Sequence, residues 1–590
     1  MRTSSAPSCL EPHQPRQAVT ALESGFEAQS PPGTNLKGAV GAANWCFLLP
    51  SLDLGRVLSL GRPSWASLFT LSKLAAELAV WAKPGEHERL QALIARQDLR
   101  NVTLLRAGTD SLPVSDDDVD VVLVAKPGLV RSQLGGARAQ AELKRVLKPG
   151  GLLYAESYPW VERWLRRPSP EPLFDQLGGR SPLWIAPAFD EMRFAAPSDA
   201  REAVEYLDRR FLRPIFRREL VKHPRRVLAR STFLTRSVRR RGVFVSGAGD
   251  EAMNGPPAYI RAIAASADAD VEGLRWALAA PGDYSSQKVL LFLFKEQGGQ
   301  PQSVVKITRD ARYNARLANE WRALTLLEER GIGQDGTCPS PLFLGHEAGL
   351  AVLGETALTG VPFLRQLKAG SQWQQAQKAV EWLGTLGAAT SHRPANAPIV
   401  VARLQAALDR FDELYRPPRD TSRFLAEQVA AIAAGGDDMS LVFQHGDPGP
   451  WNLLVTPEGR PAFLDWEAAD PDGMPLWDLF HFLRSFGFAV SKKTGTHDHV
   501  RSFAEQVLAA SELNDVLVET SARYCDEASL SPRLVEPLFY LCWMHRAVKE
   551  ASRLPNDRLQ RGRYVNFLSL AVERRDAPGL RRLFSIPAVT

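Results

Sequence analysis

The stretch VFQHGDPGPWNLLV, residues 442–455, constrains this chain more than any other part of its sequence. His445, Asp447 and Asn452 stand in the pattern H-x-D-x-x-x-x-N, and Asp465 follows thirteen residues after Asn452. The apolar triplets after Asn452 and before Asp465 predict the two strands of a β-hairpin. Paired strands would hold the polar side chains at their ends near one another. We therefore expect these residues to form one site.

The residue types match the needs of phosphoryl transfer. A hydroxyl that attacks the terminal phosphate of ATP has to be oriented and relieved of its proton, and one carboxylate in a rigid loop can do both. Asp447 is the candidate base. Magnesium that bridges phosphates prefers hard oxygen ligands, which the amide of Asn452 and the carboxylate of Asp465 supply. The alternative is a chance arrangement of His, Asp and Asn in a turn.

The same stretch resembles the catalytic loop and metal-binding aspartate of the aminoglycoside phosphotransferase and choline kinase superfamily, relatives of protein kinases. The resemblance implies a bilobal α+β protein-kinase-like fold over residues 251–590, with a small lobe to about 360 and a large lobe after it. It also implies that His445 helps to hold the catalytic loop, and that ATP and magnesium are the cofactors.

A buried lysine supports this resemblance. Lys306 lies inside the apolar run SVVKIT at 303–308, where an unpaired ammonium would be costly. Glu320 follows fourteen residues later in a predicted helix. In the family a strand lysine holds the α- and β-phosphates and pairs with a helix glutamate, so the resemblance gives these roles to Lys306 and Glu320. The alternative is an edge-strand lysine that reaches solvent.

The resemblance places two further segments at the nucleotide. Ser285 and Ser286 lie in the loop where the family covers the phosphates, between predicted strands at 274–281 and 288–295. Backbone groups near Glu355 would meet adenine, where a strand within 349–360 runs into the hinge. The large lobe is then predicted to open with helices at 372–392, 400–414 and 423–434.

The N-terminal half alternates between strand and helix patterns from about residue 45, which predicts a parallel sheet with helices on both faces. Expected strands cover 56–61, 101–108 and 119–126, and a turn at 148–151 separates a helix from the last strand. Over residues 45–160 this order resembles class I S-adenosylmethionine-dependent methyltransferases. The resemblance implies a Rossmann-like domain at 41–165.

The cofactor end of that domain departs from the family. Its first strand should run into a glycine-rich loop, but Arg62 and Pro63 follow here. Lys83 and Pro84 stand where the family places the acid that binds ribose, and Asp110 remains a candidate for the adenine amine. We therefore expect a methyltransferase-like domain that binds no cofactor, because fold alone does not imply chemistry. The alternative is an active domain that binds S-adenosylmethionine.

Length and composition limit the number of domains and the class of protein. A chain of 590 residues with 45% apolar and 23% charged residues has material for two or three domains. Five scattered cysteines favour a reducing compartment, and neither a signal peptide nor a membrane-spanning run is visible. We expect a cytoplasmic protein with a disordered tail at 1–40.

The positive charge is concentrated in one segment. Residues 209–241 hold thirteen Lys or Arg against one acid, a local net charge of +12 within a chain of +6. We expect residues 166–250 to form a basic helical extension and linker whose apolar stripe packs on the neighbouring domain. Alternatives are a peripheral anionic membrane or an acidic partner; nucleic acid is disfavoured because no base-reading motif accompanies the charge.

Together these features predict an ATP- and magnesium-dependent phosphotransferase that acts on a hydroxyl of a small molecule, such as a sugar, an amino sugar or an amino alcohol. The N-terminal domain is expected to be non-catalytic. The alternatives are a non-catalytic scaffold or regulator and a bifunctional methyltransferase-kinase.

Overall fold

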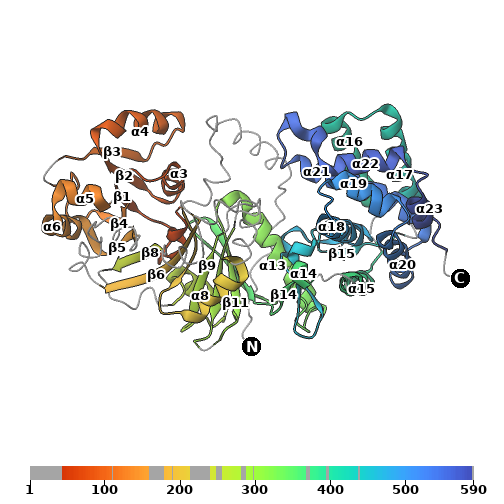
Figure 1. Ribbon diagram of the computed structural model, residues 1–590, viewed down its shortest axis with the longest axis horizontal. Helices are drawn as coiled ribbons and strands as arrows, with labels where there is room; N and C mark the ends of the chain where they lie inside the picture. Colours follow the sequence, from red (N-terminus) through yellow and green to blue (C-terminus); the bar gives the residue numbers. More distant parts are fainter. Residues whose placement is uncertain are drawn as a thin grey trace, which may run out of the picture.

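The computed structural model describes residues 43–587 except 109–110, 126, 158–178, 189–190, 213–239, 247–254, 281–287, 297, 367–371, 394–396 and 436–438. Figure 1 shows an N-terminal α/β part at one end, antiparallel strands in the middle and a helical part at the other end. The predicted tail at 1–40, Asp110, Ser285 and Ser286 lie outside the described residues.

The N-terminal part is the expected Rossmann-like sheet. Its strands pair in the order β3-β2-β1-β4-β5, and every one of these pairs is parallel. The strands are β1 (Arg56–Leu60), β2 (Glu77–Ala82), β3 (Val102–Arg106), β4 (Val119–Val124) and β5 (Leu147–Ser157), and the helices are α3 (Trp65–Leu74), α4 (Pro84–Arg96), α5 (Pro127–Leu134) and α6 (Gly136–Val146).

Both faces of this sheet are covered, as the continuous apolar strands require. Along β4, Val121 and Leu123 pack into the core that contains the apolar residues of α3 and α4. Val122 and Val124 point the other way, into the core formed with α5 and α6. The predicted turn at 148–151 is wrong as a strand boundary, because β5 already begins at Leu147. Val119 pairs with Leu147 and Val121 with Leu152, so these residues form an irregularity within the strand.

Residues 166–250 differ from the predicted helical extension. Their described part contains the strands β6 (Gly179–Ala188), β7 (Glu191–Pro197) and β8 (Arg240–Ser246), with only α8 (Arg201–Leu207) and a π-helix, η3 (Asp208–Leu212), as helices. Prolines in this segment masked the strand pattern. β8 pairs antiparallel with β5, and β6 pairs with both β8 and β7.

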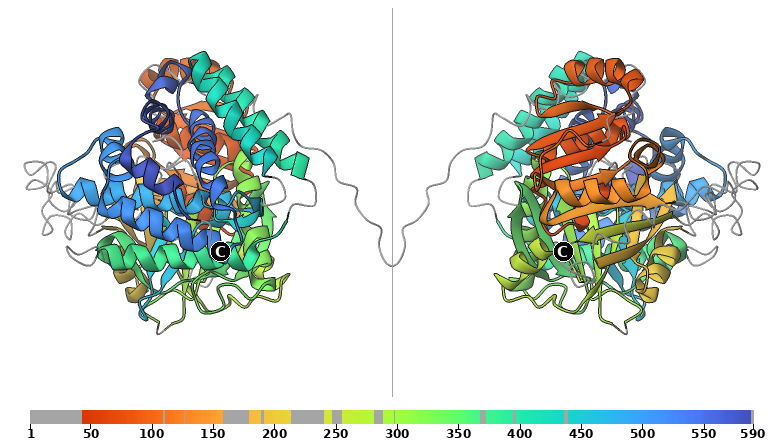
Figure 2. Two further views of the ribbon diagram at one scale, coloured as in Figure 1. Left: turned by 90° about the vertical axis from the view of Figure 1, so that its right-hand side faces the viewer. Right: turned by 90° about the vertical axis from the view of Figure 1, so that its left-hand side faces the viewer.

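These strands join the two halves of the chain into one sheet. β7 pairs antiparallel with β9 (Arg275–Ala279), where Ala195 lies opposite Leu278, and the N–H of Ala280 donates to the carbonyl of Arg193 at 2.7 Å. The resulting order is β12-β13-β11-β10-β9-β7-β6-β8-β5-β4-β1-β2-β3. In Figures 1 and 2 the orange N-terminal part is therefore joined to the green middle strands through yellow strands that include β6 and β8.

Side chains reinforce this junction. The hydroxyl of Tyr259, in α12 (Ala258–Ala265), donates to the carbonyl of Phe47 at 3.0 Å. The hydroxyl of Ser51 donates to Glu347 at 2.6 Å. One apolar cluster contains both Trp45 from the N-terminal part and Phe343 from the middle strands. The N-terminal part and these strands thus share a core as well as a sheet.

This junction predicts one cooperative unfolding transition for the N-terminal part and the middle strands. A shared core cannot be exposed from one side alone without exposing the other. We expect a tryptophan signal from the N-terminal part and a calorimetric trace to report the same midpoint for this region. Two resolved transitions, with residues 56–157 melting separately in hydrogen exchange, would contradict the prediction.

The middle strands form the predicted small lobe. β9, β10 (Lys288–Phe294), β11 (Ser303–Thr308) and β13 (Leu350–Thr356) are antiparallel neighbours, and β12 (Pro341–Glu347) adds an edge strand that the sequence analysis missed. The predicted helix that carries Glu320 is α13 (Asn314–Glu329). Phe211 of η3 stacks against Phe194 of β7 at 5.3 Å between ring centroids, so the described start of the basic segment packs on the sheet.

The large lobe is helical. The three predicted opening helices are α15 (Gln372–Thr390), α16 (Ala397–Tyr415) and α17 (Arg419–Ala434), and the predicted hairpin is β16 (Leu453–Val455) paired with β17 (Pro461–Phe463). Two later helices matter for the site: α18 (Trp477–Lys493) and α21 (Val535–Ala551). No helix among the described residues is long and apolar enough to cross a membrane.

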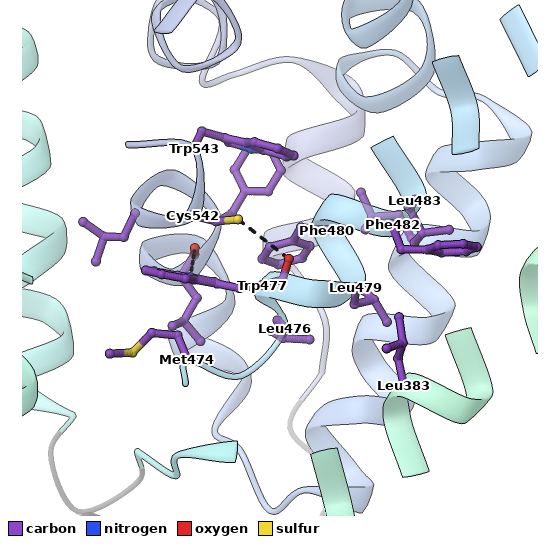
Figure 3. Close-up of a cluster of buried hydrophobic side chains, with 14 of the residues drawn as sticks. Leu383, Met474, Leu476, Trp477, Leu479, Phe480, Phe482, Leu483, Cys542 and Trp543 are labelled. Carbon is purple, nitrogen blue, oxygen red and sulfur yellow. Dashed lines mark hydrogen bonds between the residues drawn. The ribbon is translucent and has the colours of Figure 1, made fainter. Parts of the chain in front are cut away.

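Buried aromatic residues fix α18 against α21. The indole N–H of Trp477 donates to the carbonyl of Leu538 at 2.9 Å, and the thiol of Cys542 lies 3.8 Å from the carbonyl of Trp477. Figure 3 shows Trp477, Phe480, Cys542 and Trp543 close together in this core. Polar residues one turn further along each helix are thereby held at a defined separation.

Candidate functional site

The loop at 445–452 is held from below by α18. Asp478, at the start of this helix, accepts hydrogen bonds from the backbone N–H groups of His445 at 2.6 Å and Gly446 at 3.1 Å. Gly446 has φ +77°, and a Cβ there would lie 2.0 Å from the carbonyl oxygen of Ala468. The turn therefore requires glycine. Asp478 therefore supports the loop through two backbone N–H groups.

His445 ties the loop to the strand that precedes Asp465. Its Nδ1 accepts the N–H of Asp447 at 3.2 Å, and its Nε2 lies 3.0 Å from the carbonyl of Leu464. The first contact requires an unprotonated Nδ1, so the Nε2–H donates to Leu464. The side chain is fully buried. His445 thus positions Asp447 and Asp465 relative to each other.

Asp447 has a polar partner that the sequence analysis missed. Nε2 of His481, one turn after Asp478 on α18, lies 3.1 Å from Oδ1 of Asp447. Burial and the charge of Arg546 hold the pKa of His481 well below its ordinary value, so its Nε2–H donates to the carboxylate. Burial alone would raise the pKa of Asp447, but this hydrogen bond and nearby positive charge hold it far below its usual range. Asp447 is therefore ionised at neutral pH.

Asn452 and Asp465 lie at the ends of the hairpin, as predicted. The Asn452 amide nitrogen donates to the carbonyl of Asp447 at 3.0 Å, which leaves its Oδ1 for another partner. Asp465 has φ +69° and ψ +66°, the left-handed region that aspartate tolerates at a cost of order 1 kcal/mol. That conformation follows directly after β17 and turns the chain so that the carboxylate faces β10.

Two buried lysines and three further carboxylates form a cluster with this aspartate. Lys288 and Lys306 occupy one face of the sheet, because Leu290 pairs with Lys306 and side chains alternate along a strand. Nζ of Lys306 lies 2.7 Å from both Glu320 and Glu355. Nζ of Lys288 contacts Oδ1 of Asp465 at 2.5 Å, Oε2 of Glu467 at 2.9 Å and Oε2 of Glu320 at 3.7 Å.

This cluster carries surplus negative charge. Burial would lower the pKa of each lysine, but the carboxylates raise both, so both lysines are charged. Four carboxylates then face two ammonium groups. The guanidinium of Arg316 also lies 3.7 Å from Glu467. Burial, with Glu320 nearby, raises the pKa of Glu355 to about 7. Oε2 of Glu355 accepts no hydrogen bond from the described residues.

Glu355 makes stability depend on pH. Its carboxyl keeps a proton in the folded state between its ordinary value of 4.5 and about 7, whereas the unfolded chain loses it, so folding weakens as pH rises through that window. We expect Glu355→Gln to lose this dependence and to gain up to about 3 kcal/mol relative to wild type between pH 4.5 and 7.5. Chemical denaturation across pH measures it, with exposed Glu329→Gln as the control. Parallel wild-type and Glu355→Gln curves would contradict it.

The structure therefore brings together Asp447, His445, Asn452, Asp465, Lys306, Glu320 and Glu355. Glu355 differs in one respect from the expectation: it lies within β13, which continues to Thr356, and its side chain turns into the cluster. The sequence analysis missed Lys288, Glu467 and His481. His481 could have been predicted from the sequence, because it stands three residues after Asp478 among the apolar residues that begin this helix.

The described residues after β1 and β2 differ from the cofactor site that the resemblance to methyltransferases implies. After Gly61, Arg62 and Pro63 lead to Ser64, whose side chain caps α3, so no glycine-rich loop follows β1. Trp81 and Ala82 are fully buried at the end of β2, and the exposed Lys83 precedes α4. Among the described residues, the three that directly follow β2, 83–85, include no carboxylate for the ribose. Glu86 comes next in the sequence and faces Arg62 at 3.8 Å.

The comparisons with solved structures show weak likenesses. The chain is 20% identical to the YcgJ protein from Bacillus subtilis over 19% of its own length and 52% of that chain, about half of it, with a TM-score of 0.17. It is 15% identical to the aminoglycoside phosphotransferase APH(3'')-Id from Streptomyces rimosus over 52% and 94% of the two chains, with a TM-score of 0.28. It is 12% identical to the bifunctional kinase-methyltransferase WbdD over 89% and 84%, with a TM-score of 0.22. At such TM-scores these likenesses carry no argument about function.

No curated protein matches the chain. The model of the phosphotransferase enzyme family matches residues 277–517. This range contains both buried lysines, the loop at 445–452 and Asp465. The C-terminal part of the chain is therefore a phosphotransferase-family domain.

Proposed function

We propose that the protein transfers the terminal phosphate of ATP to a hydroxyl of a small molecule. The observation that carries the proposal is the convergence of an ionised Asp447, the oxygen ligands Asn452 and Asp465, and the paired Lys306 and Glu320. These groups come from the loop at 445–452, the residues after β17, the strand β11 and the helix α13, and a non-catalytic scaffold would not require them together. Family membership of residues 277–517 supports the same reaction class.

Asp447 orients the attacking hydroxyl and accepts its proton. Because His481 holds one carboxylate oxygen at 3.1 Å, the other oxygen is left for the acceptor. The low pKa of Asp447 makes it a weak base, which suits a loose transition state in which the proton is lost late. Lys306, fixed by Glu320 and Glu355, carries the positive charge that binds the phosphates of ATP.

Magnesium fits the donor set beside Asp465. Among the described residues, no group of three or more His, Cys, Asp or Glu is arranged to hold a metal alone. Magnesium bound with a nucleotide needs only one or two protein ligands, since phosphates and water supply the rest. Oδ1 of Asn452 and the carboxylate of Asp465 would hold it, and the surplus negative charge of the cluster favours a divalent cation. When bound, the ion neutralises charge that develops on the phosphates.

The N-terminal domain serves as a structural extension of the small lobe in this proposal. We expect magnesium and ATP to raise the melting temperature of the protein, whereas S-adenosylmethionine leaves it unchanged. A ligand at a hundred times its dissociation constant stabilises a protein by about 2.7 kcal/mol, which thermal shift detects easily. Stabilisation by S-adenosylmethionine would instead support a bifunctional enzyme.

The experiment that tests the proposed function is acceptor-dependent ADP formation by the purified protein with magnesium and ATP. A panel of neutral, acidic and amino-substituted hydroxyl compounds supplies the acceptors, and mass spectrometry identifies the phosphorylated product. Omission of magnesium should abolish turnover. If ATP neither binds nor is consumed with any acceptor, the proposal is wrong.

A further inference from the structure

A second group of positive side chains, distinct from the lysine cluster, lies near Asp447. Arg546 and Lys549 stand three residues apart on α21 and therefore share a face of that helix. Arg546 donates to the carbonyl of Gly446 at 3.0 Å, and its Nη1 lies 4.0 Å from Oδ1 of Asp447. Lys549 thus lies one turn further along the face that meets the loop.

A second helix adds to this positive charge. Arg484 follows His481 by three residues on α18, and it donates to the hydroxyl of Tyr564 at 3.0 Å. Tyr564 belongs to α22 (Arg563–Glu573), and the guanidinium of Arg563 lies 5.4 Å from its ring. The rings of Tyr564 and His481 are 6.2 Å apart, which links these residues to Asp447.

The acids that face this group do not balance it. Asp478 is occupied by two backbone N–H groups, and Glu550 pairs with Arg563 at 2.9 Å. Among the described residues, no carboxylate lies within ion-pair distance of Arg484 or Lys549. Arg484 is only 4% exposed, and its Nε donates to nothing that the structure describes. The guanidinium also lies over the rings of Tyr564 and Phe567, at 5.2 and 5.0 Å from their centroids, so it has aromatic and hydroxyl partners but no carboxylate to balance its charge.

Two neighbouring histidines, and Lys549 itself, have lowered pKa values. Burial and the nearby Arg and Lys side chains lower the pKa of His499 to about 4 and of His545 to about 3. Burial and Arg546 likewise lower the pKa of Lys549, to about 8. Burial is the largest cause of all three shifts, and the neighbouring Arg and Lys side chains act in the same direction.

We propose that the acceptor is an anionic alcohol, with a carboxylate or phosphate group in addition to the hydroxyl that is phosphorylated. This inference rests on the proposed function and narrows its substrate class. Lys549 and Arg546 recognise the anionic group by charge-assisted hydrogen bonds, and Arg484 adds a favourable field. Trp451, 53% exposed and 6.2 Å from the His481 ring, offers an apolar surface to the carbon skeleton. Amino sugars and amino alcohols are repelled.

Matched acceptors test the proposal: a neutral sugar, its uronic acid, its phosphate ester and its amino derivative. We expect kcat/KM to be highest for one of the two acidic members, which also separates carboxylate from phosphate recognition. Lys549→Gln should lower kcat/KM for that acceptor by roughly ten- to a hundredfold and change the neutral one by less than about twofold. Lys295→Gln is the control. It removes an exposed lysine that directly follows β10, roughly 20 Å from Lys288, and it should leave kcat/KM unchanged for both acceptors.

A second readout does not depend on turnover. With a non-hydrolysable ATP analogue present, calorimetry should show tighter binding of the acidic acceptor to wild type than to Lys549→Gln or Lys549→Glu. If the neutral or amino member binds better, or if Lys549→Gln weakens all members equally, the charge serves the transferred phosphate and this inference is overturned. The phosphotransferase proposal would then still stand, because it fails only if no acceptor stimulates ADP formation.

Discussion

Replacement of Asp447 by asparagine should abolish acceptor-dependent ADP formation. The amide cannot accept the proton of the attacking hydroxyl, and a positioned base contributes between roughly a hundredfold and ten-thousandfold to such rates. The variant should still fold, because Asp478 and His445 hold the loop through backbone contacts that do not involve the Asp447 carboxylate. Affinity for ATP should remain close to that of wild type, so the loss should appear in kcat.

Steady-state kinetics and ATP binding measured on the same preparation check this expectation. Asp526→Asn changes an exposed aspartate of α20 (Glu512–Glu527) and serves as the matched control, with unchanged kinetics expected. If Asp447→Asn kept more than about a tenth of the wild-type kcat, another group would have to be the base. His481 would be the next residue to examine, since it is the hydrogen-bond partner of Asp447.

Replacement of Lys288 by methionine should destabilise the protein and impair its activity together. Lys288 neutralises Asp465 and Glu467 at 2.5 and 2.9 Å, and its side chain is only 7% exposed. Removal of one partner from a buried ion pair typically costs 3–5 kcal/mol, because the remaining charge stays buried without compensation. Displacement of the Asp465 carboxylate should also reduce kcat through the magnesium site.

A double-mutant cycle isolates the pair. Lys288→Met should cost less in an Asp465→Asn background, since the unpaired charge is then absent. Lys295→Met, at the exposed end of the same strand, controls for the loss of a lysine. Denaturant unfolding gives the free energies, and equal costs of Lys288→Met in both backgrounds would show that the pair is not coupled.

The residues that meet ATP in the proposal were largely predictable because they follow local rules. A lysine inside an apolar strand and a glutamate in the next helix predict a buried ion pair. Lys306 and Glu320 do form one. The burial of Lys288 could not be predicted in this way, because Lys288 is the first residue of its strand and looks like a residue at the strand boundary. Its burial depends on contacts with residues 177 and 179 positions away, which no local pattern encodes.

The long-range pairings of the sheet were equally hidden. Strand β6 contains Pro182 and Pro187, strand β7 ends at Pro197, and their partners β8 and β9 lie far along the chain. The functions of Ser285, Ser286 and Asp110 stay predictions. Arg546 and Lys549 were not predicted for a different reason. The sequence of their helix is that of an ordinary amphipathic helix, and only its packing against α18 shows that the charged face meets Asp447.

The pairing of β7 with β9 also shapes how the chain is made. β7 is complete at Pro197, but β9 ends at Ala279, 82 residues later, so synthesis at about 5–20 residues per second leaves an open strand edge for roughly 5–15 seconds. An unpaired edge strand is a template for association with other chains. A fragment that ends near residue 246 should therefore oligomerise through β7, and the nascent protein needs its second half, or a chaperone, to protect the first.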